Sequence, residues 1–210
     1  MTANHAARTA ENEAAFLLPH LKLYFHILDL GCRPGTITRG LAKYVPEGSV
    51  TGIDLAPEVI EQAKSLAGQA GGVPSNVTFV TGNLLEGLQF GDETFDVIFM
   101  SQVLIHVPEP VKALTELRRV LKTGGCIADC EGDFPFHWQP YLPGLASLNK
   151  YMYEMVVTRR NTGSPHPDHP PYGRDHRGGS LVHVWAREAG FEPGMIEKIA
   201  KATMYRTPEE

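Results

Sequence analysis

The chain has few cysteines and no long apolar run. Its 210 residues include only three cysteines, Cys32, Cys126 and Cys130. Because this number is small and odd, we expect buried thiols in a reducing compartment and no disulfide framework. No apolar run approaches the roughly 20 residues of a transmembrane helix, and Glu11 and Glu13 interrupt the segment where a secretory signal would lie. These absences predict a cytoplasmic protein without a membrane partner.

An excess of basic residues is also missing. The chain has 19 Lys and Arg residues against 24 Asp and Glu residues, and its formal net charge is -5. No basic stripe is interleaved with aromatic residues, so we expect no nucleic-acid partner. The apolar share of 42% and the charged share of 20% are ordinary for a globular protein. A chain of this length forms one core, so we predict a single domain over residues 1–210.

Between residues 26 and 132, short apolar runs alternate with stretches of helical spacing. Strands are predicted over residues 26–31, 49–55, 76–82, 95–100 and 126–132. Helices are predicted over residues 36–45, from Pro57 to Gly68, and from Pro110 to Gly124 and Gly125. The alternation predicts parallel crossovers, and hence a doubly wound, mostly parallel Rossmann-like α/β sheet with helices on both faces.

The two ends of the chain have other patterns. Residues 5–18 predict a helix, which makes residues 1–20 an N-terminal lid. Beyond the fifth strand, helices are predicted over residues 141–158 and 180–190, on either side of an irregular loop rich in proline, glycine and histidine at 164–179. A sixth strand is predicted near residues 195–206. Too few residues follow it for an antiparallel return strand, so we expect an incomplete sheet edge.

A glycine-containing loop follows the first predicted strand, in the stretch ILDLGCRPGTITRG at residues 27–40. Gly31 allows a tight turn, and Gly35 lets the next helix pack close to the strand. The free N–H groups of that helix favour an anionic group. Asp54 ends the second predicted strand and is suited to accept both hydroxyls of a ribose. A dinucleotide site has glycines at intervals of two and three, which the spacing from Gly31 to Gly35 excludes.

From Asp29 to Gly132 the chain resembles the class I S-adenosylmethionine-dependent methyltransferases, and within them the branch related to ubiquinone and menaquinone methyltransferases. The stretches ILDLGCRPGTIT and VTGIDLAPEVIEQA carry the resemblance most specifically, and the later GGSLVHVWAREAGF is similar to fungal small-molecule methyltransferases. The resemblance implies S-adenosyl-L-methionine as cofactor, residues 26–132 as its binding core and residues 133–210 as the substrate side. It also implies a small-molecule substrate, such as a secondary metabolite, methylated on sulfur, oxygen, nitrogen or carbon. A homodimer or a methyltransferase-like partner is compatible with it.

The resemblance also implies which residues hold the cofactor on the first two strands. Asp29 and Gly31 would frame its methionine part, with Arg33 and Gly35 in the same loop. Asp54 would hold the ribose. The next residue, Leu55, would lie against the adenine.

The cofactor site would continue at the ends of the third and fourth strands. The Gly-Asp pair typical of the family is Gly82-Asn83 here, so Asn83 would accept a hydrogen bond from the adenine amino group without contributing a charge, beside Leu84. Ser101 and Gln102 would end the fourth strand next to the methyl donor.

Two residues are candidates for catalysis. Methyl transfer from a sulfonium needs alignment, exclusion of water and, for a hydroxyl or carbon nucleophile, a base. His106 and Asp133 would face the substrate side, the latter in place of the acid of the family's Arg-x-x-Asp motif. His106 could instead pack at the surface, and Asp133 could make a turn only. A thiol nucleophile would need little help from a base.

Arg33 is an argument against catalytic activity. The family has glycine here, because the backbone passes close to the ligand, often at positive φ, where a side chain costs about 1 kcal/mol or more. The arginine could point outward or lie across the methionine pocket. Together with the incomplete sheet edge, Arg33 leaves the alternative of a non-catalytic or truncated methyltransferase homologue that acts as an interaction partner.

Several other residues favour structural interpretations. The histidines and Asp168 in the 164–179 loop are more typical of an irregular loop than of a zinc site, so no metal is expected. Tyr151, Tyr153 and Trp185 are expected in the core or in a pocket wall. Arg8 could reach the carboxylate of the cofactor, but a solvated arginine is the commoner case.

Overall fold

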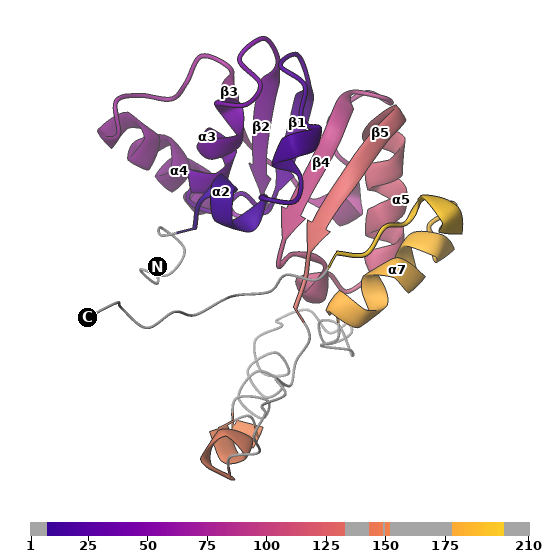
Figure 1. Ribbon diagram of the computed structural model, residues 1–210. Helices are drawn as coiled ribbons and strands as arrows, with labels where there is room; N and C mark the ends of the chain where they lie inside the picture. The colour runs from indigo at the N-terminus through magenta and orange to yellow at the C-terminus, as the bar shows by residue number, and fades with distance from the viewer. Residues whose placement is uncertain (1–7, 133–142, 149, 152–177, 200–210) are drawn as a thin grey trace, which may run out of the picture.

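Five parallel strands form one sheet in the order β3-β2-β1-β4-β5 (Figure 1). The computed structural model describes residues 8–132, 143–148, 150–151 and 178–199. The strands are β1 (His26–Leu30), β2 (Ser49–Asp54), β3 (Val77–Thr81), β4 (Phe95–Ser101) and β5 (Leu121–Cys130). The predicted doubly wound parallel sheet is therefore confirmed.

Helices cover both faces of the sheet. They are α2 (Ala10–Glu13), α3 (Thr36–Ala42), α4 (Pro57–Gln69), α5 (Pro110–Val120) and α7 (Gly178–Glu188). Helices α2, α3 and α4 pack on one face, and α5 and α7 pack on the other (Figure 1). Short 3-10 turns are η1 (Leu18–His20), η2 (Leu84–Glu86), η3 (Leu104–His106) and η4 (Pro193–Met195). Residues 143–148 and 150–151 are also helical.

The central strands are apolar on both sides because both faces are covered. On β4, Val97 and Phe99 belong to the cluster under α2, α3 and α4, whereas Ile98 and Met100 belong to the cluster under α5 and α7. Trp185 packs against this second cluster, as expected for a core residue. The alternation of the two sets along one strand fixes the register of the sheet.

The order of the strands creates one switch point. The chain leaves β1 toward β2 and β3 on one side and later adds β4 and β5 on the other side of β1. Connections from the carboxyl ends of β1 and β4 therefore diverge over opposite faces. Ligands of open α/β sheets bind in the crevice that such a divergence leaves.

Two predicted helix boundaries are wrong. The N-terminal helix covers only Ala10–Glu13 of the described residues, because Thr9 is extended and its hydroxyl caps the helix by accepting from the Asn12 amide. The helix α5 ends at Val120, before the glycines. Leu121 already pairs with Phe95, and the register then shifts before Val97 pairs with Cys126, so the two glycines lie in an irregular stretch of β5.

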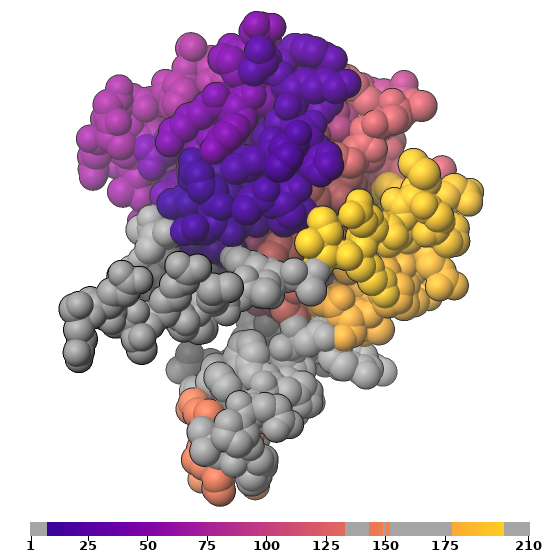
Figure 2. All heavy atoms as spheres, in the orientation of Figure 1, coloured from indigo at the N-terminus to yellow at the C-terminus, as the bar shows by residue number. Residues whose placement is uncertain are grey.

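β5 is the edge of the sheet among the described strands, and part of the segment 121–130 reaches the surface in the space-filling view (Figure 2). Cys126 is accordingly exposed and Cys130 half-buried, while Cys32 is buried. The expectation of three buried thiols is thus wrong for Cys126. Tyr151 is 66% exposed, whereas a place in the core or in a pocket wall was expected, and Tyr153 lies outside the described residues.

The predicted C-terminal strand is not seen in its described part. Residues 193–195 form η4 and residues 196–199 belong to no strand. Residues 200–206, like most of the predicted 141–158 helix and the 164–179 loop, lie outside the described residues, so the missing return strand stays a prediction. No helix of the described part is long and apolar enough to cross a membrane.

Candidate functional site

The loop after β1 adopts left-handed backbone conformations at three positions. The φ angles are 68° at Gly31, 47° at Arg33 and 73° at Gly35. A Cβ on Gly31 would lie 2.8 Å from Val103 Cγ2, and one on Gly35 would lie 2.5 Å from the ring of Phe79. Gly35 thus lets α3 begin close against the sheet, as expected from the sequence. The loop leaves no room for side chains at either glycine.

A cavity of about 530 Å³ lies beside this loop. The carboxyl ends of β1 and β2 and the segments after β3 and β4 form its walls. Its lining residues are Leu30, Gly31, Arg33, Ile53, Asp54, Leu55, Val59, Gly82, Asn83, Leu84, Leu85, Gln102, Val103, His106, Val107 and Pro108. This volume lies within the range of small-molecule sites, and an apolar wall with few polar groups is typical of them.

Asp54 presents a carboxylate to the cavity. Its Oδ2 accepts from the Arg33 amide at 3.2 Å, and its Oδ1 accepts from the Ala56 amide at 3.3 Å. A carboxylate oxygen can accept more than one hydrogen bond, so both oxygens keep capacity for the hydroxyls of a ligand. Leu55 is 62% exposed at the same edge and offers an apolar surface.

Asn83 serves first as a cap of η2. Its Oδ1 accepts from the Leu85 amide at 3.0 Å, and its Nδ2 donates to Glu86 at 2.8 Å. The amide oxygen has a second lone pair. Asn83 can therefore accept from a ligand in the cavity only in addition to its structural bond.

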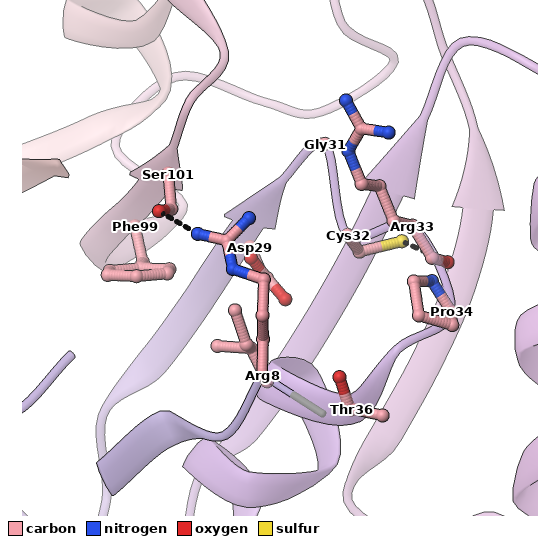
Figure 3. A pocket seen from close by; sticks show the side chains of 10 residues that line it. Arg8, Asp29, Gly31, Cys32, Arg33, Pro34, Thr36, Phe99 and Ser101 are labelled. Atoms are coloured by element: carbon pink, nitrogen blue, oxygen red, sulfur yellow. Dashed lines mark hydrogen bonds between the residues drawn. The ribbon is translucent and has the colours of Figure 1, made fainter. Parts of the chain in front are cut away.

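A second, narrower pocket shares Gly31 and Arg33 of the β1 loop with the larger cavity (Figure 3). It is lined by Asp29, Ser101 and Arg8, among other residues. The Arg8 guanidinium lies between Asp29 and Ser101 in this view, donates to Ser101 Oγ at 2.6 Å and pairs with Glu13 at 2.9 Å. Arg8 is thus largely withdrawn from water, and the expectation of a solvated arginine is wrong.

Asp29 is buried to 97%, with 3% exposed, at the base of this pocket. Burial raises the pKa of its carboxyl to about 7, against the lowering effects of the hydrogen bond from Thr38 Oγ1, at 2.5 Å, and of the positive charge of Arg8. Asp54 raises it slightly further. A cation bound next to Asp29 would favour its ionised form.

Arg33 does not cross the narrow pocket. In Figure 3 its side chain extends away from Arg8 and Asp29, and the residue also lines the larger cavity. Arg33 is half-buried and lines both pockets, so it neither swings out into solvent nor lies across the narrow pocket. The left-handed backbone remains, although arginine takes the place of glycine.

The β4 end supplies the opposite wall. Ser101 is buried, whereas Gln102 and the exposed His106 line the larger cavity. Asp133, the other candidate catalytic residue, lies outside the described residues. The structure therefore places every described candidate in the wall of the larger cavity or of the narrow pocket, except Gly35, which lines neither.

Residues 27–125 match the model of a methyltransferase domain. An uncharacterized methyltransferase of Schizosaccharomyces pombe is 32% identical over 209 residues, which cover 98% of this chain and 70% of the relative. The chain belongs to the class I S-adenosylmethionine-dependent methyltransferases.

Two further comparisons agree. The probable methyltransferase ltbC of Aspergillus luteorubrus is 50% identical to the methyltransferase chain over 127 residues, 58% of this chain and 45% of the relative. The chain thus spans less than half the length of that relative. A solved structure of a putative methyltransferase from Bacillus halodurans has a TM-score of 0.61 at 21% identity, over 87% of this chain and 69% of the other, and shows the same fold.

The residues present fit the cofactor of this family. The larger cavity of the methyltransferase joins a carboxylate to apolar walls, which suits a nucleoside. The narrow pocket joins a buried acid to an arginine, which suits the zwitterionic end of an amino acid. Sequence reasoning missed Val103 and the Val107–Pro108 wall, because nothing in a short apolar turn indicates which way it faces.

We predict that the left-handed backbone at position 33 carries strain. Arg33→Gly should exceed Arg33→Ala in free energy of unfolding by about 1 kcal/mol, because only glycine adopts a φ of 47° without cost. Urea unfolding of the two variants measures this difference. Both variants lack the side-chain contacts of arginine, so a more stable alanine variant would contradict the prediction.

We also predict a pH-dependent stability due to Asp29. Because its pKa is raised to about 7 in the folded state, the folded protein holds a proton that the unfolded chain loses near pH 4, and stability falls as pH rises toward 7. The wild type should lose about 2–3 kcal/mol of its free energy of unfolding between pH 5 and pH 8 because of this group, and Asp29→Asn should lack this loss. Asp96→Asn is the matched control, since the pKa of Asp96 is lowered and leaves this window unaffected. The free energy of unfolding is measured by urea unfolding at each pH. The same pH dependence in the wild type and in Asp29→Asn would contradict the raised pKa of Asp29.

Proposed function

We propose that the chain catalyses methyl transfer from S-adenosylmethionine to a small molecule. The observation that carries the proposal is the joint placement of Asp54 and the β1 loop around a cavity of about 530 Å³. Such a volume admits a nucleoside and leaves limited space for an acceptor. A small substrate, for example a secondary metabolite, suits this space better than a folded macromolecule.

In this proposal the nucleoside occupies the larger cavity. Asp54 accepts hydrogen bonds from the two ribose hydroxyls, Leu55 packs against the adenine, and Asn83 and Leu84 border the base. Gly31 lets the ligand approach the backbone. Bound S-adenosylmethionine supplies an electrophilic methyl group on its sulfonium.

The amino-acid end would enter the narrow pocket. This pocket has room for only about 20 Å³, the space of a single water molecule. Arg8 therefore turns from Ser101 to the incoming carboxylate, and Asp29 in its ionised form accepts from the ammonium group. The guanidinium and carboxyl then hold the two charges of the ligand.

The substrate would lie against the wall formed by Gln102, Val103 and Val107. This wall excludes water, which keeps the nucleophile aligned with the methyl group. His106 lines the same cavity, and we assign it the role of proton acceptor for substrates that need one. Asp133 follows β5 in sequence and remains the second candidate for this role.

The non-catalytic alternative rests on Arg33 and on the predicted lack of a return strand. The side chain of Arg33 lines the narrow pocket but extends away from Arg8 and Asp29, so it leaves the place of the amino-acid end open (Figure 3). We therefore favour an active enzyme.

We expect Asp54→Ala to abolish binding of S-adenosylhomocysteine in isothermal titration calorimetry, because the ribose hydroxyls lose both acceptors. Glu61→Ala is the control: Glu61 lies on α4, is 72% exposed and pairs only with Lys64 among the contacts that the structure describes. Unchanged affinity of Asp54→Ala would contradict the assignment of the larger cavity as the nucleoside site.

A second titration tests the role of Arg8. Arg8→Ala should weaken binding of S-adenosylhomocysteine by about 10- to 100-fold, the effect of losing a charge-assisted pair. Methylthioadenosine has no amino-acid end, so its affinity should be the same for the variant and the wild type. Equal losses for both ligands would show that Arg8 supports the fold instead of the ligand.

A further inference from the structure

Glu131 follows β5 and reaches across to the segment after β4. Its Oε1 accepts from the amide of Val103 at 2.6 Å and from the amide of Leu104 at 2.7 Å. These amides lie at the start of η3, where no side chain of the turn itself provides a cap. Helical turns leave their first N–H groups unpaired, so a carboxylate from another strand is what satisfies them here.

The residue before the turn, Gln102, has an unfavourable backbone conformation. Gln102 has a left-handed backbone with a φ of 58°, a conformation that persists only where its surroundings hold it. Its amide and its Nε2 both donate to the Cys130 carbonyl, at 2.9 and 3.2 Å. Residues 102–104 therefore donate four hydrogen bonds to the end of β5 and the residue after it, two to the Cys130 carbonyl and two to Glu131.

The turn that Glu131 caps is a wall of the cavity. Gln102, Val103 and His106 all line it. Val103 also contacts the other side of the site, since its Cγ2 fills the space that a Cβ on Gly31 would need. A shift of the turn would therefore change the distance between the β1 loop and the β4 wall.

The carboxyl group of Glu131 lies near that of Asp129. Burial raises the pKa of Asp129 well above its usual range, and the nearby Glu131 raises it further. Burial also raises the pKa of Glu131, while hydrogen bonds from backbone amides of residues 103–105 lower it. The amides favour the charged form of Glu131, whereas burial and the neighbouring Glu131 favour the protonated form of Asp129. This arrangement maintains an acceptor at the turn.

We propose that Glu131 is a positioning residue that fixes the 102–106 wall of the cavity through its two hydrogen bonds to Val103 and Leu104, and so sets the affinity for the cofactor. The inference rests on the proposed function. The turn needs an acceptor oxygen at hydrogen-bond distance from the two amides. The length of the side chain therefore matters more than its charge. Glu131 itself lines neither the larger cavity nor the narrow pocket.

Three substitutions separate reach from charge. Glu131→Gln keeps an oxygen at the same distance without charge, Glu131→Asp keeps the charge on a side chain one methylene shorter, and Glu131→Ala keeps neither. Two readouts are measured on the full chain: amide hydrogen exchange of residues 103 and 104, which needs no ligand, and calorimetric affinity for S-adenosylhomocysteine.

We expect Glu131→Asp and Glu131→Ala to increase exchange at these amides by about 10-fold or more and to weaken binding by about 10-fold. Glu131→Gln should stay within about 3-fold of the wild type in both readouts. Asp96→Ala is the matched control, because its Oδ2 likewise accepts from a backbone amide, that of His26 at 2.8 Å, but at the start of β1 and β4. It should leave both readouts unchanged.

The outcomes are distinct. Unchanged exchange in Glu131→Asp, or equal damage by Gln and Asp, overturns the positioning role; should Glu131→Ala not fold, this pair still decides. Faster exchange with unchanged binding overturns the link between the wall and the cofactor. If the wild type itself binds no S-adenosylhomocysteine while exchange changes as expected, the proposed function fails and the structural role of Glu131 stands.

Discussion

The pairing of β1 with β2 on one side and β4 on the other is the constraint on which the site depends. It places the carboxyl ends of the two central strands side by side and sends their connections over opposite faces. The crevice between them is a consequence of this topology. Residues far apart in sequence, Gly31 and Gln102, face one cavity for this reason alone.

The charged groups around the crevice differ in how deeply they are buried. Asp54 stands at the rim with two long hydrogen bonds from backbone amides, whereas Asp29 is buried and its pKa is raised to about 7. Arg8 reaches the same pocket from the N-terminal segment and bonds to Ser101. Burying charged groups is costly without partners. Here Thr38 donates to Asp29, and Arg8 bonds to Ser101 and Glu13, so each group has a partner that offsets part of this cost.

The core of the fold was predictable because periodicity is a local signal. The five strands and the helices α3, α4 and α7 follow from apolar runs, prolines and glycines. The errors fall where a distant partner overrides the local pattern. Leu121 pairs with Phe95 and turns the end of a predicted helix into a strand, and Thr9 caps a helix that begins later than the apolar pattern indicated.

The sequence by itself determined the family, the β1 loop and the acids at the ends of β1 and β2, because these depend on residue identity at fixed spacing. Only the tertiary structure decided which way Arg33 points, that Arg8 is drawn to Ser101, and that Glu131 caps the turn at Val103. Each of these depends on side chains meeting across more than 20 residues of sequence or on free space beside the loop. Spacing along the chain carries no information on such contacts, because the packing of the strands decides them.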